Sequence, residues 1–220
     1  MQRVKNLWSY FYDFRYELLS IILVWILFGG TIIPHALFDH LLLPLSILIL
    51  ALVSMATVKY ERKIVRFIFG CFAILMFVVM LLYNMLHRPE SLQMISLSIS
   101  TIFFVLLSLE VFKQMVLEKS VTRSIIFAAF DCYLLLGIIG ATLFTIILSF
   151  DPLAFSNTED SVNVFEKMLY FSFITITSIG YGDITPVSSI AQKLTAFFGL
   201  IAHFYSVVIV GIIVGKYVAK

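Results

Sequence analysis

Long apolar runs with almost no charge divide this chain, and they limit its possible folds more than any other feature. A helix needs about 20 mainly apolar residues to cross a hydrocarbon core roughly 30 Å thick. Only helices and closed barrels satisfy their backbone polar groups in lipid, so runs of this kind predict six membrane-spanning helices. They lie at residues 17–33, 41–58, 66–86, 92–112, 124–149 and 189–215. A shorter apolar segment, residues 162–177, precedes a glycine-rich turn and predicts a re-entrant helix.

The composition excludes a water-soluble globule and a disordered chain. Of the 220 residues, 61% are hydrophobic and 13% are charged, whereas soluble domains are about half apolar and a quarter charged. Disordered segments carry far less apolar surface than this chain does. Both cysteines, Cys71 and Cys132, lie inside apolar runs, which favours buried thiols over a disulfide framework. The predicted fold class is therefore an all-α membrane protein.

Basic residues are unevenly divided between the two predicted sides of the membrane. If the N-terminus, the second and fourth connections and the C-terminus share one side, that side holds 12 of the 15 lysines and arginines. The other side holds Arg88, Lys167 and Lys193. The positive-inside rule then predicts that both termini are cytoplasmic. We expect a cell membrane location, and a small chain of this kind suits a prokaryotic inner membrane.

The order of the apolar runs predicts three parts of the chain. Residues 1–16 are rich in aromatic and basic side chains and are expected to form an interfacial segment at the inner headgroups. Residues 17–122 contain four predicted spans and form a peripheral domain. Residues 123–220 contain a span, the re-entrant helix and the last span. The strongest boundary is expected near Ser120–Arg123, after a short amphipathic linker.

The glycine-rich turn carries the most specific motif, because residues 175–183 read Thr-Ile-Thr-Ser-Ile-Gly-Tyr-Gly-Asp. Glycines at alternating positions allow the unusual dihedrals that a strand with all its carbonyls on one side requires. Irregular backbone at membrane depth is tolerated only beside protein or water. The segment resembles the selectivity filter of the potassium channel family, which reads Thr-Val-Gly-Tyr-Gly and then Asp. The matching residues are Ser178, Ile179, Gly180, Tyr181, Gly182 and Asp183, preceded by Thr177.

The resemblance covers about residues 124–219 and implies a homotetramer that conducts K⁺ through a central pore. The implied K⁺ ligands are the carbonyls of Ser178, Ile179, Gly180 and Tyr181, in rings that replace the hydration shell of the ion. The Ser178 hydroxyl is expected to form the innermost ring, although serine lacks the β-branch of the family's usual threonine, which fixes the rotamer. Tyr181 is expected to point away from the ion, into an aromatic cuff of the pore helix.

Two further positions of the re-entrant helix differ from the family's usual residues. Tyr170 stands where the family commonly has tryptophan, and the resemblance implies that it bonds Asp183 behind the filter. Ile174 stands where some relatives have glutamate, so a carboxyl pair behind the filter is absent.

The fourth predicted span lacks the charges that voltage gating requires. From Leu92 to Phe112 it contains no lysine or arginine, and Glu110 is its only charged residue. Voltage-gated relatives carry an arginine at every third position there, because one charge moved through 100 mV changes the energy by about 2.3 kcal/mol. We therefore expect a four-helix domain that resembles a voltage sensor without working as one. Its hydroxyl residues are expected to pack and hydrogen-bond between helices; they are Ser96, Ser98, Ser100, Thr101 and Ser108.

Candidate cavity and gating residues lie on the last span: Gly199, Ala202, His203, Ser206, Val210 and Val214. The resemblance places His203 at the cavity, where protonation of four imidazoles would repel K⁺. Alternatively, His203 is a structural residue bonded to the Tyr205 hydroxyl or to a group of the fifth span. Gly199 and Gly211 either let the helix bend or pack closely, and Ala202 occupies the family's usual hinge position. Asp131, in the fifth span, is a functional candidate as an intramembrane acid, or it forms a structural hydrogen bond to the fourth or last span.

The sequence contains no nucleophile–base pair, metal-ligand spacing or phosphate loop. We therefore expect no enzyme activity, no cofactor and no nucleic-acid partner. The expected partners are other copies of the chain, the lipid bilayer and K⁺. Three alternatives stay open: a weakly selective cation channel if Ser178 loosens the filter, a potassium uptake transporter subunit, and a non-conducting modulatory subunit of other potassium channels. The transporter chains carry four degenerate filter-like loops, whereas a single intact one is present here.

Overall fold

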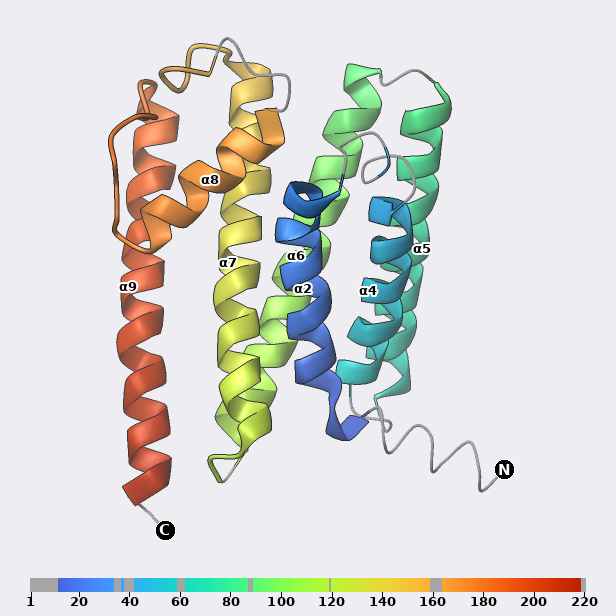
Figure 1. The fold of residues 1–220 in the computed structure, drawn as a ribbon, viewed down its shortest axis with the longest axis vertical. Helices are drawn as coiled ribbons and strands as arrows, with labels where there is room; N and C mark the ends of the chain where they lie inside the picture. The colour runs from blue at the N-terminus through green and yellow to red at the C-terminus, as the bar shows by residue number, and fades with distance from the viewer. Residues whose placement is uncertain are drawn as a thin grey trace.

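A computed structural model describes residues 12–33, 37, 42–58, 62–86, 89–118, 120–158 and 164–218, and most of them are helical (Figure 1). The helices are α2 (Arg15–Ile32), α4 (Leu43–Thr57), α5 (Lys63–Met85), α6 (Glu90–Leu117), α7 (Arg123–Phe150), α8 (Val164–Ile176) and α9 (Ser189–Val218). Five of these helices are long and apolar enough to cross a membrane: α2, α5, α6, α7 and α9. The apolar helix α4 is shorter, at 15 residues. The described part of the chain is thus an all-α membrane protein.

Each predicted apolar run coincides with a helix, and one helix end differs from the prediction by more than three residues. Helix α6 continues to Leu117, five residues past the predicted end at Phe112. A charged residue ends an apolar run without ending a helix: Lys113 extends to the surface, while Gln114 is buried and hydrogen-bonded. The described residues between α6 and α7 are therefore few, and most of the stretch before Ser120 that was predicted as an amphipathic linker belongs to the last turns of α6.

The predicted interfacial segment is only partly covered, because residues 1–11 lie outside the described residues. Arg15 and Tyr16, at its end, form the first turn of α2. Tyr16 is 2% exposed, and its hydroxyl donates to Gln114 Oε1 over 2.9 Å. Tyr16 therefore packs against the helix bundle, where a buried amide provides a partner for its hydroxyl. The location of residues 1–16 at the inner headgroups stays a prediction.

Helix α7 lies at the centre of the molecule. Figure 1 shows α2, α4, α5 and α6 on one side of it and α8 with α9 on the other. Helices α2 and α6 both pack against α7, and α4 and α5 pack between them and away from α7. In the apolar window of α7, 61% of the residues are buried, compared with 17% in the window of α9. A single chain thus leaves most of α9 uncovered.

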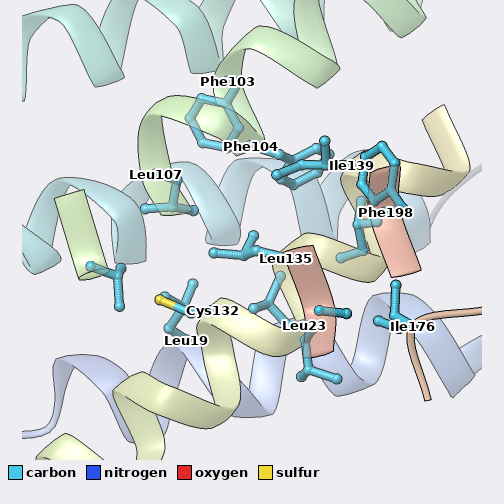
Figure 2. Close-up of a cluster of buried hydrophobic side chains, with 14 of the residues drawn as sticks. Leu19, Leu23, Phe103, Phe104, Leu107, Cys132, Leu135, Ile139, Ile176 and Phe198 are labelled. Atoms are coloured by element: carbon cyan, nitrogen blue, oxygen red, sulfur yellow. The ribbon is translucent and has the colours of Figure 1, made fainter. Parts of the chain in front are cut away.

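The core fills the space where α2 and α6 meet α7 (Figure 2). Leu19 and Leu23 of α2, Leu107 of α6 and Leu135 of α7 are completely buried there. Lipid tails are as apolar as leucine, so these contacts stabilise the bundle by van der Waals packing more than by removal from water. Interhelical hydrogen bonds add to the packing, and the predicted role of Thr101 is confirmed, since its hydroxyl donates to Thr142 Oγ1 over 2.8 Å.

Asp131 occupies a completely buried position on α7. Its Oδ1 accepts a hydrogen bond from the Ser20 hydroxyl of α2, while its Oδ2 has no partner among the described residues. The predicted partner on the fourth or last span is therefore wrong. The first span provides the bond instead, because α2 packs directly against α7.

Candidate functional site

The re-entrant helix α8 approaches α7 closely because two glycines of α7 leave room for it. A Cβ at Gly137 would lie 2.5 Å from the ring of Phe173, and one at Gly140 would clash with Ser172 Oγ. Ser172 is completely buried and donates to Gly137 O over 2.7 Å. In Figure 1, α8 lies inclined between α7 and α9 in the upper half of the molecule. The chain that follows α8 returns upward along the left edge of the molecule.

The C-terminus of α8 holds the first part of the returning chain. The carbonyl of Ile174 accepts the N–H groups of Ile179 at 3.0 Å and Gly180 at 3.1 Å. The N–H of Ser178 donates to Thr175 O over 3.0 Å, and Tyr133 of α7 donates its hydroxyl to Ile176 O over 2.8 Å. These bonds satisfy carbonyls that a helix end leaves without partners. They also direct the N–H groups of residues 178–180 toward α8.

The carbonyls of residues 177–182 are free of hydrogen bonds from the described residues. Among the described residues, no hydrogen bond is accepted by a carbonyl of residues 177–182, and residues 177–183 are all exposed in the single chain. Positive φ angles alternate along the strand, with +58° at Ser178, +51° at Gly180 and +77° at Gly182. The sequence predicted unusual dihedrals at the two glycines. It did not predict the positive φ of Ser178, although Ser178 lies two residues before Gly180 and so continues the same alternation.

The outer end of the segment is held at Asp183. Tyr170 donates its hydroxyl to Asp183 Oδ2 over 2.7 Å, which is the contact that the sequence predicted. This hydrogen bond raises the pKa of Tyr170 to about 12, so the hydroxyl keeps its proton at neutral pH. The Asp183 carbonyl accepts a second bond, from Asn157 Nδ2 at 2.7 Å. Sequence reasoning missed Asn157, because no motif marks its loop.

The predicted aromatic cuff around Tyr181 is not formed within one chain. Tyr181 is 72% exposed, and Ile179 is 53% exposed. Ile174 is buried at the C-terminal end of α8, so an apolar side chain lies where some channels have a carboxyl group. Any cuff around Tyr181 would need residues from another chain.

The candidates on α9 do not share one environment. Ala202 is completely buried against its own chain, so it does not belong to an exposed stripe with His203 and Ser206. The hydroxyl of Tyr205 donates to Ala129 O over 2.7 Å, and not to His203. A Cβ at Gly199 would meet no atom within 4 Å in this chain, and the same holds for Gly211. Close packing within the chain therefore does not explain either glycine. Val210 and Val214 are exposed, at 62% and 54%.

Residues 132–219 match the family model described as "Ion channel". This part of the chain is therefore similar to the domains of that family. The matched range begins within α7 and includes α8, the segment 177–183 and the whole of α9. No curated protein and no solved structure matches the chain. The match supports ion transport across a membrane as the function, and it favours a transport protein over an enzyme.

Proposed function

We propose that four copies of this chain form a potassium-selective pore through which K⁺ passes down its electrochemical gradient. The observation that carries the proposal is the row of carbonyls in the exposed segment 178–181, which accept no hydrogen bond from a described residue. The N–H groups of Ser178, Ile179 and Gly180 donate to carbonyls of α8. These three N–H groups are therefore not free to turn toward an ion, and the carbonyls are the backbone groups that remain available to it. Rings of carbonyl oxygens are the ligands that replace water around K⁺.

The same geometry supports an assembly around an axis. One chain supplies one strand of carbonyls, so a closed ring requires symmetric copies. Phe204 and Val207 on α9 are 68% and 60% exposed in the single chain, as is most of Tyr181. Neighbouring copies packed around α8 and α9 would cover these side chains. Helix α8 also ends at the carbonyl row, and the negative end of a helix dipole favours a cation.

We infer that the protein lies in a cell membrane with both termini cytoplasmic, and that this membrane is the inner membrane of a prokaryote. The start of α2 and the end of α9 lie at the same end of the molecule in Figure 1. The basic residues of helix ends and turns at that end support the cytoplasmic orientation; they are Arg15, Arg62, Lys63, Arg66, Lys113, Arg123 and Lys216.

Conventional voltage gating is not part of the proposal. Glu110 is the only charged residue of α6 from Leu92 to Phe112. It is largely buried and pairs with Arg62, the residue before α5, at 3.3 Å, and it also accepts a bond from Gln114 at 2.8 Å. These bonds support a fixed structural role for Glu110 and leave α6 without a row of charges that a voltage could move.

Cation flux into proteoliposomes tests this function. We expect K⁺ uptake that Ba²⁺ blocks and a much smaller Na⁺ uptake. Gly180→Ala should remove the difference between K⁺ and Na⁺, because a side chain at φ +51° costs roughly 1–2 kcal/mol. Equal K⁺ and Na⁺ fluxes that resist Ba²⁺ would contradict the proposal. A stable tetramer without any flux would favour the non-conducting modulatory subunit.

A weakly selective cation channel is the second candidate, and Ser178 favours it. The Ser178 hydroxyl makes no hydrogen bond to another described residue, and serine lacks the β-branch that restricts χ1. An oxygen ring built from such side chains would hold an ion less firmly. Reversal potentials in mixed K⁺ and Na⁺ solutions distinguish the two candidates, since only the weakly selective channel gives values between the two equilibrium potentials.

A further inference from the structure

Two segments on the outer side of the channel domain pair with each other: residues 151–158, after α7, and residues 183–188, after the carbonyl row. Phe155 and Pro186 form an isolated antiparallel bridge. The hydroxyls of Ser156 and Thr185 lie 2.8 Å apart. Backbone N–H groups also donate across the pair at 2.8–3.2 Å, from Ser156 to Thr185 O, and from Val187 and Ser188 to Ala154 O. We call this pairing the outer clip.

The outer clip is anchored in the protein interior by Phe155. Its ring is 3% exposed and makes edge-on contacts with Phe144 of α7 at 5.6 Å and Phe171 of α8 at 5.2 Å. Phe198 of α9 packs on the same Phe144 ring at 5.6 Å. The clip is thus anchored directly on α7 and α8, and Phe198 of α9 contacts the same cluster through Phe144. Asn157 follows the anchor residue Phe155 by two positions.

Asn157 links the outer clip to the end of the carbonyl row. It has a φ of +56°, a conformation that asparagine adopts more readily than most residues. Its Nδ2 donates to Asp183 O over 2.7 Å, and its own carbonyl accepts a bond from Lys167 Nζ of α8 at 3.0 Å. Tyr170 holds the Asp183 carboxylate at the same time. Asp183 is therefore held through its side chain by α8 and through its main chain by the outer clip.

We propose that Asn157 is a positioning residue for the outermost carbonyls of the pore, those of Tyr181 and Gly182. By holding the Asp183 carbonyl, it prevents the adjoining peptide from rotating and turning the Gly182 carbonyl away from the ion path. The inference rests on the proposed potassium conduction. Without Asn157, the Tyr170 bond to the Asp183 carboxylate and bound K⁺ remain as restraints on these carbonyls. Of the two, only the K⁺ restraint grows with ligand concentration, because a ligand stabilises the state that binds it.

Two variants of the full chain test the proposal in planar bilayers. Asn157→Asp keeps the size and the tolerance of positive φ but loses the donor, and Asn157→Gly keeps the backbone freedom but loses the side chain. One side-chain hydrogen bond corresponds to a change of roughly three- to tenfold. We expect both variants to lower the K⁺/Na⁺ permeability ratio by that amount at low external K⁺, and high external K⁺ to restore it. Ser149→Ala is the control, since it removes a hydroxyl that bonds only within α7.

The readouts separate the possible failures. If the wild type is selective and both variants match it at low external K⁺, the positioning role is overturned. If the variants lose selectivity and external K⁺ does not restore it, while the melting temperature falls, Asn157 is merely structural and the proposal is also overturned. If the wild type itself does not prefer K⁺, the proposed function fails, and that result is visible before any variant is compared.

Discussion

Tyr170 is the residue whose hydroxyl most directly supports the outer end of the carbonyl row, through its bond to Asp183. Tyr170→Phe removes this donor and keeps the ring. We expect the K⁺/Na⁺ permeability ratio to fall roughly three- to tenfold, the range for one hydrogen bond, and bilayer recordings of reversal potential measure it. Because the pKa of Tyr170 is raised to about 12, the bond persists at neutral pH and is lost only as the external pH rises through that value. An unchanged ratio in the variant would contradict this role.

Residues bonded to Asp183 illustrate what the sequence can and cannot predict. The bond from Tyr170 was predictable, because the resemblance to potassium channels extends to the helix before the motif and implies this contact. The bond from Asn157 was not, because Asn157 lies 26 residues away in a loop without a motif. Asp131 shows a similar limit: its burial followed from the apolar run around it, but its partner Ser20 depends on α2 packing against α7. Long-range partners depend on tertiary packing, which residue spacing does not encode.

At the scale of helices, the close contact between α7 and α8 decides where the carbonyl row lies. Gly140→Ala places a methyl group against Ser172 Oγ, which is fully buried and already bonded to Gly137 O. Overpacking at such a contact costs about 1–3 kcal/mol. We therefore expect a lower melting temperature in detergent and reduced K⁺ selectivity, because α8 must move away from α7.

Gly70→Ala on α5 is the matched control for this substitution. A Cβ there would lie 3.5 Å from the Met55 side chain, which is ordinary contact. Alanine is favoured over glycine inside a helix by about 0.5–1 kcal/mol, so this variant should be at least as stable as the wild type. If both alanine variants behave alike, the tight α7–α8 contact is not what positions α8.

Helix positions were largely predictable, whereas helix ends and contacts were not. Each apolar run became a helix because a buried or lipid-facing backbone must satisfy its own polar groups. The extension of α6 to Leu117 was missed because Gln114 finds buried partners in Thr57 O and Glu110. The glycines that admit α8 were present in the sequence, but only the structure shows that Gly137 and Gly140 face Phe173 and Ser172.

At the scale of the whole molecule, a single chain leaves much of its channel-like region uncovered. Its central helix α7 is well buried, while most of α9 and the whole of residues 177–183 remain exposed. The motif predicted which residues belong to the carbonyl row, but contacts between chains lie beyond one chain's sequence pattern. Tyr181 is the clearest case, since it was expected in an aromatic cuff and is 72% exposed alone.

Heavy-ion density in the assembled protein tests the central claim most directly. A structure of the purified protein in Rb⁺ or Tl⁺, both substitutes for K⁺, should show four chains around one axis. We predict a column of ion density on that axis, surrounded by the carbonyls of Ser178, Ile179, Gly180 and Tyr181. An assembly without a fourfold axis, or residues 178–181 turned toward lipid with no ion density beside them, would contradict the account.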